Sequence, residues 1–177
     1  PHGVIRMKVA SEDELKAAPA DKKVIAHLSG DFLNKETSVA EFMMASIERV
    51  EKDTDGFFMM VECCYPDKGG HGNDPSKTVL GTIHMDYAVK AAVDYAAKNG
   101  DTLVLVTADH ETGGIVNVAR DENELTVTYT TGSHTGVNVP VYVFGAGAES
   151  FAGELDNTDL PKKMAAFWGI ELEKLEE

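Results

Sequence analysis

The chain has 177 residues, of which 43% are apolar and 26% charged, the composition of an ordinary globular protein. Its net charge of −14 argues against a nucleic-acid-binding surface and against an anionic membrane as a partner. No apolar run approaches the roughly 18 residues that a transmembrane helix needs. We therefore expect one globular domain over residues 1–177 that binds neither nucleic acid nor a membrane.

Apolar periodicity and turn residues predict helices and strands that alternate along much of the chain. The predicted helices begin near 11–14 and cover 39–52, 75–99 and 158–168. The predicted strands cover 23–28, 57–61, 103–106 and 139–144, with a hairpin over 115–119 and 124–130. Ser38 and Glu41 have the spacing of a capping box, and Asp74 before Pro75 is typical of a helix start. The order predicts helices that cover a mostly parallel sheet.

Side chains that can bind metals gather in three predicted loops. The candidates are Glu62, Asp67, His71, Asp109, His110 and His134. The first three follow the strand over 57–61, the next two follow the buried strand over 103–106, and the last lies in a loop over 132–136. Because ligands gather at the carboxyl ends of the strands in open α/β sheets, we expect these loops to meet at one edge.

Imidazole and carboxylate ligands together suit Zn²⁺, and a carboxylate to one side suits Mg²⁺. Six groups are too many for one tetrahedral ion, so the pattern predicts a multi-metal cluster, which can clamp both oxygens of a displacement at phosphorus. Each group taken alone has an ordinary explanation, as a surface carboxylate, a polar loop residue, a helix cap or a surface histidine. Their concentration at one sheet edge favours the metal cluster.

At these residues the sequence resembles the C-terminal half of the alkaline phosphatase family. The resemblance extends over about residues 23–170, and it rests on GFFMMVE at 56–62, D-x-x-x-H at 67–71, TADHETGG at 107–114, GSHTG at 132–136 and VPVY at 139–142. It implies a three-layer α/β/α sandwich around a mostly parallel sheet, of which this chain holds a part.

Carried over position by position, the resemblance also implies roles for the candidate residues. The ligands of a first zinc ion would be Asp67, His71 and His134. Asp109 and His110 would belong to a second zinc site, and Glu62 would belong to a magnesium site. Lys68 stands where family members vary, and it is either a phosphate contact through water or an ordinary surface lysine.

The chain departs from the family pattern in two respects. Cys63 and Cys64 follow Glu62 where the family has small residues. We expect two buried free thiols, with metal capture by a thiolate as the alternative. The family's nucleophilic serine in a D-S-A-type motif, its phosphate-binding arginine and its metal-bridging aspartate have no match here. We therefore expect part of a longer alkaline phosphatase that is inactive by itself.

The resemblance implies metal-dependent hydrolysis of phosphate monoesters by a protein exported to the periplasm or the extracellular space, and a homodimer would fit the family. The first residues show no basic and then apolar block of the kind that directs export. The alternative is a truncated, non-catalytic metal-binding or structural α/β module. A phosphodiesterase or phosphomutase on the same metal scaffold is a third hypothesis, which the TADHETGG and SHTG segments oppose.

Overall fold

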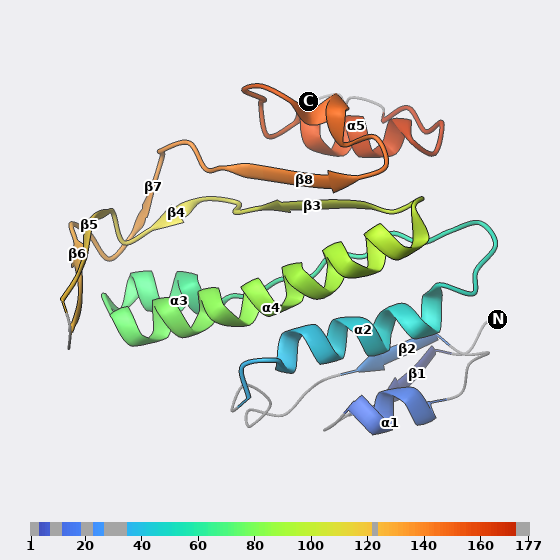
Figure 1. Cartoon of the computed structure of the whole chain (residues 1–177), viewed down its shortest axis with the longest axis horizontal. Coiled ribbons are helices and arrows are strands. Elements are labelled where there is room, and N and C mark those ends of the chain that lie inside the picture. Colours follow the sequence, from blue (N-terminus) through green and yellow to red (C-terminus); the bar gives the residue numbers. More distant parts are fainter. Residues whose placement is uncertain (1–3, 8–11, 19–22, 27–34, 122–123, 173–177) are drawn as a thin grey trace. The chain divides into compact units, whose positions relative to one another are not determined.

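The computed structural model describes residues 4–7, 12–18, 23–26, 35–121 and 124–172. The chain divides into two compact units, whose elements are labelled in Figure 1. The first unit comprises Pro1–Ala92 and Ala108–Pro140, and the second comprises Val93–Thr107 and Val141–Glu177. All six residues of the predicted metal centre therefore belong to the first unit.

Two strands and two helices open the first unit. They are β1 (Val4–Met7), α1 (Glu12–Ala17), β2 (Lys23–Ala26) and α2 (Ser38–Val50). β1 and β2 pair in parallel, which confirms the predicted strand as far as residue 26, and residues 27–28 lie outside the described part. Both predicted helices are present in this segment.

A small apolar cluster joins α1 to α2. Leu15 and Ala45 are buried together, and Phe42 packs against them. Nη1 of Arg49 donates to the carbonyl oxygens of Leu15 and Ala18, at 3.3 and 2.8 Å. The Leu15 carbonyl also accepts the backbone N–H of Ala18 at 3.2 Å, so Arg49 reinforces the end of α1.

The start of α2 differs from the predicted capping box. Thr37 is the N-cap residue, and Ser38 already belongs to the helix. The hydroxyl of Ser38 donates to the carbonyl of Lys35 at 2.6 Å, and the amide of Glu41 donates to the carbonyl of Thr37. The reciprocal Ser38–Glu41 bonds are thus replaced, because Ser38 uses its hydroxyl to hold the preceding turn.

The segment after α2 does not form the predicted buried strand. Residues 57–61 join none of the four two-stranded sheets that the described residues form. Phe58 and Met60 are 63% and 81% exposed, whereas the alternate positions are half-buried. Exposed and half-buried side chains alternate along this segment as they would in a strand. Its apolar composition, however, does not specify another strand with which it could pair.

The predicted loop over 63–74 contains a helix, α3 (Tyr65–His71). Pro66 suits the first turn of this helix, where its missing N–H costs nothing. A Cβ on Gly69 would lie 2.5 Å from the backbone nitrogen of Thr78, and a Cβ on Gly70 would lie 2.5 Å from the carbonyl oxygen of Thr112. The two glycines therefore permit close packing of α3, although in the sequence they suggest a loop.

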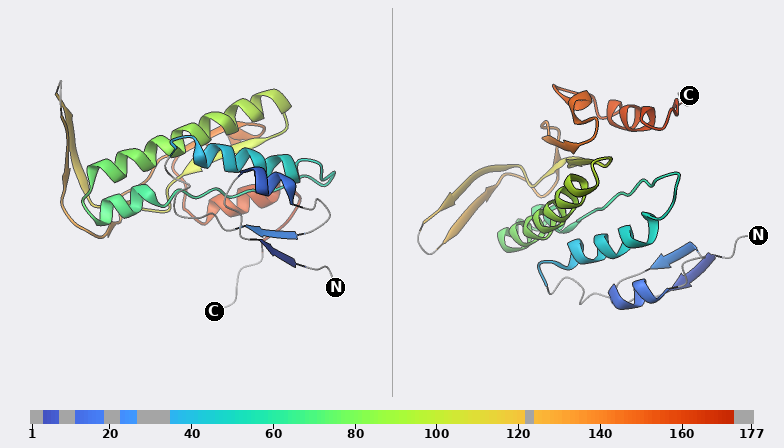
Figure 2. Two further views of the ribbon diagram at one scale, coloured as in Figure 1. Left: turned by 90° about the horizontal axis from the view of Figure 1, so that it is seen from below. Right: turned by 45° about the vertical axis from the view of Figure 1, so that its right-hand side comes forward.

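α3 lies beside the N-terminal half of α4 (Pro75–Asn99), as Figures 1 and 2 show. The predicted start of α4 is confirmed, because Oδ1 of Asp74 accepts a bond from the backbone N–H of Lys77 at 3.1 Å. The predicted end is also confirmed. Gly100 has φ +79° and donates its N–H to the carbonyl of Ala96 at 2.8 Å.

Four short strands complete the first unit. They are β4 (Glu111–Thr112), β5 (Ile115–Arg120), β6 (Leu125–Tyr129) and β7 (His134–Thr135). β5 and β6 form the predicted hairpin, which can be followed in both views of Figure 2. β4 pairs with β7, and Gly113 and Gly114 turn the chain from β4 into β5 with φ of +96° and +56°.

The second unit contains β3 (Leu103–Thr107), β8 (Val141–Gly145), a 3-10 helix η2 (Ala148–Phe151) and α5 (Asp159–Ala166). β3 and β8 are antiparallel, and Pro140 precedes β8 directly, as expected for a proline at a strand start. Phe151 is buried and stacks on Phe167 with ring centroids 6.3 Å apart. The interior of β3 is half-buried, so the prediction of a fully buried strand is wrong.

The predicted succession of strands and helices is present except for the strand over 57–61, and the predicted mostly parallel sheet is not confirmed. Among the strand pairs of the described residues, β1–β2 is parallel and the other three are antiparallel. None of the described helices combines the length and apolar character that a membrane span requires.

The packing of α3 predicts a specific loss of stability. Replacing Gly69 with alanine places a Cβ against the backbone of Thr78, so we expect a loss of about 1–3 kcal/mol in urea unfolding. Gly136→Ala is the matched control, because a Cβ there meets nothing within 4 Å. It should stay within about 0.5 kcal/mol of the parent. Equal effects of the two substitutions would contradict the packing argument.

Candidate metal centre

Two of the predicted ligands lie one turn apart on α3. Asp67 and His71 have the i, i+4 spacing that brings side chains together on a helix, and Nε2 of His71 is 3.4 Å from Oδ1 of Asp67. Nδ1 of His71 lies 2.7 Å from the carbonyl oxygen of Gly132. Because that oxygen only accepts, Nδ1 holds the proton and Nε2 presents its lone pair toward Asp67.

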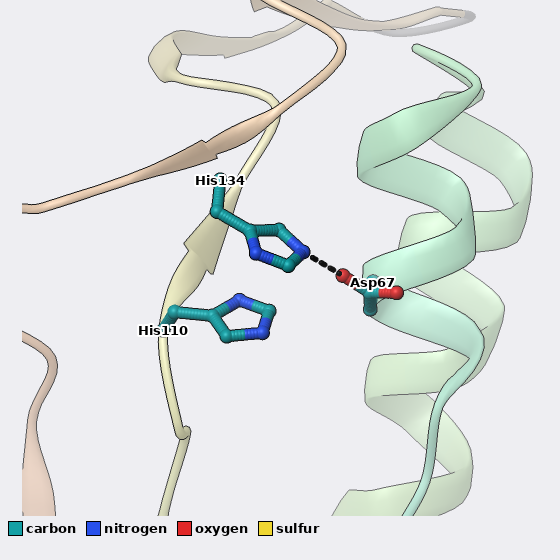
Figure 3. A group of neighbouring side chains, drawn as sticks. All are labelled: Asp67, His110 and His134. Atoms are coloured by element: carbon teal, nitrogen blue, oxygen red, sulfur yellow. Dashed lines mark ion pairs between the residues drawn. The ribbon is translucent and has the colours of Figure 1, made fainter.

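The third ligand of the predicted first site comes from β7. Figure 3 shows the ring of His134 directed at Asp67, and Nε2 of His134 is 3.3 Å from Oδ1 of that residue. The same nitrogen is 3.1 Å from Nε2 of His71. The structure therefore brings His134 to two side chains of α3 that lie more than sixty residues earlier in the sequence.

Nε2 of His71, Oδ1 of Asp67 and Nε2 of His134 form a triangle, and its size fits a tetrahedral metal ion. Ligand atoms about 2.0–2.1 Å from such an ion are separated by roughly 3.3–3.4 Å. The sides of the triangle measure 3.1, 3.3 and 3.4 Å. The side chains of His71, Asp67 and His134 are 43%, 37% and 49% exposed, so a fourth position is open to solvent or substrate. An open position distinguishes a catalytic zinc site from a closed structural one.

A second pair of predicted ligands lies beside the triangle. Nε2 of His110 is 3.2 Å from Oδ2 of Asp109. The ring of His110 stacks on that of His134, with centroids 3.5 Å apart and an interplanar angle of 22°. Asp67, His110 and His134, drawn in Figure 3, each offer a ligand atom within 4.8 Å of the others. His110 therefore lies directly beside the triangle, with Asp109 as its own neighbour.

Thr112 was not among the sequence-based candidates, although it contacts two of them. Its hydroxyl donates to Oδ1 of Asp67 at 2.8 Å and lies 3.2 Å from Nδ1 of His110. The bond from Thr112 holds the pKa of the Asp67 carboxyl below its usual value, and the neighbouring histidines add to this effect while burial opposes it. Asp67 is therefore ionised at neutral pH, as a metal ligand must be.

Glu111 was also missed, and it braces the two strands that carry His110 and His134. Its carboxylate accepts bonds from the hydroxyl of Thr135 in β7 and from the backbone N–H groups of Gly114 and Ile115, both at 3.1 Å. The Thr135 hydroxyl is the main cause that lowers the pKa of the Glu111 carboxyl, and the two amides contribute. The ionised Glu111 side chain thus connects β4, the turn that follows β4, and β7.

The remaining candidates make none of the contacts described above among the described residues. Glu62 is exposed ahead of α3 and is not in the metal-competent group of the described residues, and Lys68 is exposed on α3. Cys63 and Cys64 are free thiols as predicted, but they are half-buried rather than buried. Burial raises the pKa of the Cys63 thiol, and its Sγ lies 3.5 Å from the carbonyl oxygen of Gly81 as a donor. These features favour a thiol over a metal-binding thiolate.

Comparison with known proteins shows which family this chain resembles. A family model described as alkaline phosphatase matches residues 13–124. Alkaline phosphatase 3 of Bacillus subtilis is 28% identical over 72% of this chain, and alkaline phosphatase H of Pseudomonas aeruginosa is 30% identical over 70%. Streptomycin-6-phosphate phosphatase of Streptomyces griseus is 34% identical over 65%. The matched regions cover 43%, 30% and 30% of those proteins, so the chain spans less than half of their length.

Solved structures give the same result for the fold. The alkaline phosphatase from the Antarctic bacterium TAB5 superposes with a TM-score of 0.81 at 27% identity, covering 93% of this chain and 52% of that one. A variant of the TAB5 enzyme, described with Mg bound in its M3 site, superposes with a TM-score of 0.77 at 26% identity and covers 96% and 53% of the two chains. These likenesses show the predicted α/β fold class.

The Glu111 brace predicts a local effect on backbone protection. Glu111→Ala removes the acceptor of the Gly114 and Ile115 amides, so we expect hydrogen exchange at both to accelerate at least about tenfold. Glu124→Ala, an exposed glutamate of the same unit, should leave both rates unchanged. Unaltered exchange in Glu111→Ala would show that these amides are protected by other contacts.

Proposed function

Because the chain belongs to the alkaline phosphatase family, we propose that it supplies the metal-binding part of an enzyme that hydrolyses phosphate monoesters. The observation that carries the proposal is the convergence of Asp67, His71 and His134 on a triangle of tetrahedral size. The first two of these residues lie within the segment matched by the family model. Two imidazoles and one carboxylate are a ligand set that Zn²⁺ accepts.

We assign a first zinc ion to this triangle and a second to Asp109 and His110. A bound zinc ion would lower the pKa of a coordinated water and offset the charge of a phosphate oxygen. The residues themselves hold the ligand atoms in place: Gly132 fixes the tautomer of His71, and His134 is held by the pairing of β7 with β4. Bound cations would also counter the repulsion that a chain of net charge −14 exerts on phosphate.

Glu62 and Lys68 are assigned more peripheral roles. We propose that Glu62 contributes one carboxylate to a magnesium site, whose other ligands come from residues outside this sequence. The TAB5 variant described with Mg in its M3 site is in keeping with such an ion in a related protein. Lys68 is exposed beside Asp67, and we propose that its ammonium group contacts substrate phosphate through water.

We further propose that the chain by itself binds metal without turning over substrate. None of its serines stands in the D-S-A context of the family's nucleophile. Only Asp109 and His110 are assigned to the second zinc site, which is fewer ligands than a zinc ion usually takes from a protein. Hydrolysis would therefore require residues from elsewhere in a longer protein. Export from the cytoplasm and assembly as a homodimer follow from the family as proposals.

Metal content of the purified chain tests this function. With Zn²⁺ and Mg²⁺ supplied, we expect elemental analysis to find about one tightly bound zinc per chain, the number that one complete triangle predicts. His134→Ala should lose it, because that change removes one side of the triangle. His110→Ala is the matched control and should retain it. Turnover of p-nitrophenyl phosphate should be undetectable in all three proteins.

Three results would contradict the proposal in different ways. Zinc retained in His134→Ala would place the metal elsewhere in the chain. Absence of zinc from the parent chain would favour a structural α/β module without a metal. Turnover by the parent chain would show that this sequence contains its own nucleophile.

A further inference from the structure

We propose that Thr112 is a positioning residue whose single hydroxyl links the two ligand sets and fixes the tautomer of His110. The proposal rests on the proposed function in one respect, namely that Asp67 and His110 are metal ligands. It begins from two contacts of the same oxygen atom. Oγ1 of Thr112 is 2.8 Å from Oδ1 of Asp67 and 3.2 Å from Nδ1 of His110.

Counting protons decides the direction of both bonds. A threonine hydroxyl carries one proton and can accept further bonds, whereas an ionised carboxylate can only accept. The Thr112 proton is therefore committed to Asp67. The bond between Thr112 and His110 then forms only when Nδ1 of His110 is the donor. Thr112 thus favours the Nδ1–H tautomer of His110 and leaves the lone pair on Nε2.

The tautomer matters because of what Nε2 faces. Nε2 of His110 lies 3.2 Å from Oδ2 of Asp109. With the proton on Nδ1, both atoms are electron-pair donors, so their approach is favourable only when a cation lies between them. Partners that hold the outer nitrogen of a histidine in this way orient the ring and raise its basicity as a ligand. Thr112 would therefore prepare His110 for metal while it also holds Asp67.

The backbone of Thr112 is fixed on two sides, which makes its hydroxyl a precise link. In the β4–β7 pair, Thr112 stands opposite His134. Its carbonyl oxygen lies so close to Gly70 of α3 that a Cβ there would be 2.5 Å away. Its branched side chain also has a restricted χ1. The hydroxyl therefore keeps one position relative to α3, which carries Asp67, and to His110 beside it.

The tautomer of His110 can be measured without any metal. Side-chain ¹⁵N NMR of the metal-free chain, at a pH where the imidazole is neutral, should show a substantial Nδ1–H population of His110, in competition with the Nε2–H form that the Asp109 carboxylate favours. Thr112→Val keeps the branched shape without the hydroxyl and should shift His110 toward the Nε2–H form. Thr112→Ser should restore the parent spectrum. Thr130→Val is the matched control. Its hydroxyl donates to the carbonyl of Gly114 at 2.9 Å and not to a candidate ligand, so the His110 spectrum should stay unchanged.

Zinc titration supplies the second readout. Thr112 is also an outer partner of Asp67, a ligand in the triangle that takes the one tightly bound zinc. Loss of such a partner weakens metal binding by about 10–100-fold, so we expect that loss in Thr112→Val and recovery to within about threefold in Thr112→Ser. If Thr112→Val fails to fold, Thr112→Ala removes the same hydroxyl with a smaller side chain. It should give the same tautomer shift and the same loss of affinity.

Two outcomes would overturn the role of Thr112. An unchanged His110 tautomer in the folded valine or alanine variant would show that the hydroxyl does not set it. Zinc binding that is lost as strongly in Thr112→Ser, which keeps the hydroxyl, as in Thr112→Val would show that the hydroxyl does not account for the affinity. A parent chain that shows the Nδ1–H form but binds no zinc would instead contradict the proposed function and leave the positioning role intact.

Discussion

The candidate metal centre depends on the pairing of β4 with β7, a sheet only two residues long on each strand. This pairing places His134 opposite Thr112, and it brings the ring of His134 into stacking contact with that of His110. So short a ladder is weak by itself, because two strands without a packed face are marginally stable in water. The Glu111 carboxylate compensates, since it accepts bonds from β7 and from the turn after β4 at the same time.

The second constraint is the approach of α3 to this small sheet. Without a side chain on Gly70, the helix comes into direct contact with the backbone of β4 at Thr112. That contact sets how closely Asp67 and His71, both on α3, approach His134 on β7. The result is a group of electron-pair donors with little to neutralise them inside the protein, which is an arrangement that a cation stabilises. The acidic balance of the whole chain acts in the same direction.

Much of the fold and of the candidate metal centre could be predicted from the sequence, because residue types and their order along the chain are known without a structure. Most of the order of helices and strands and the two ends of α4 followed from residue types and spacing, as did the choice of Asp67, His71 and His134 as neighbours. The helix at Tyr65–His71 did not, since Pro66 and two glycines suggest a loop unless one knows what packs on them. Partners for the segment 57–61 could not be predicted either, because an apolar run specifies burial but no neighbour.

The residues that were missed share a different reason. In the segment from His110 to Thr112 alternate side chains point to opposite faces, so position 112 follows position 110 toward the metal ligands and Glu111 points away from them. That alternation could have identified Thr112 as a neighbour of His110. It could not have supplied the bond to Asp67, which is 45 residues distant in the sequence and depends on the packing of α3. Sequence reasoning therefore finds metal ligands by their chemistry, whereas the groups that orient them are ordinary threonines and glutamates whose roles exist only in the folded chain.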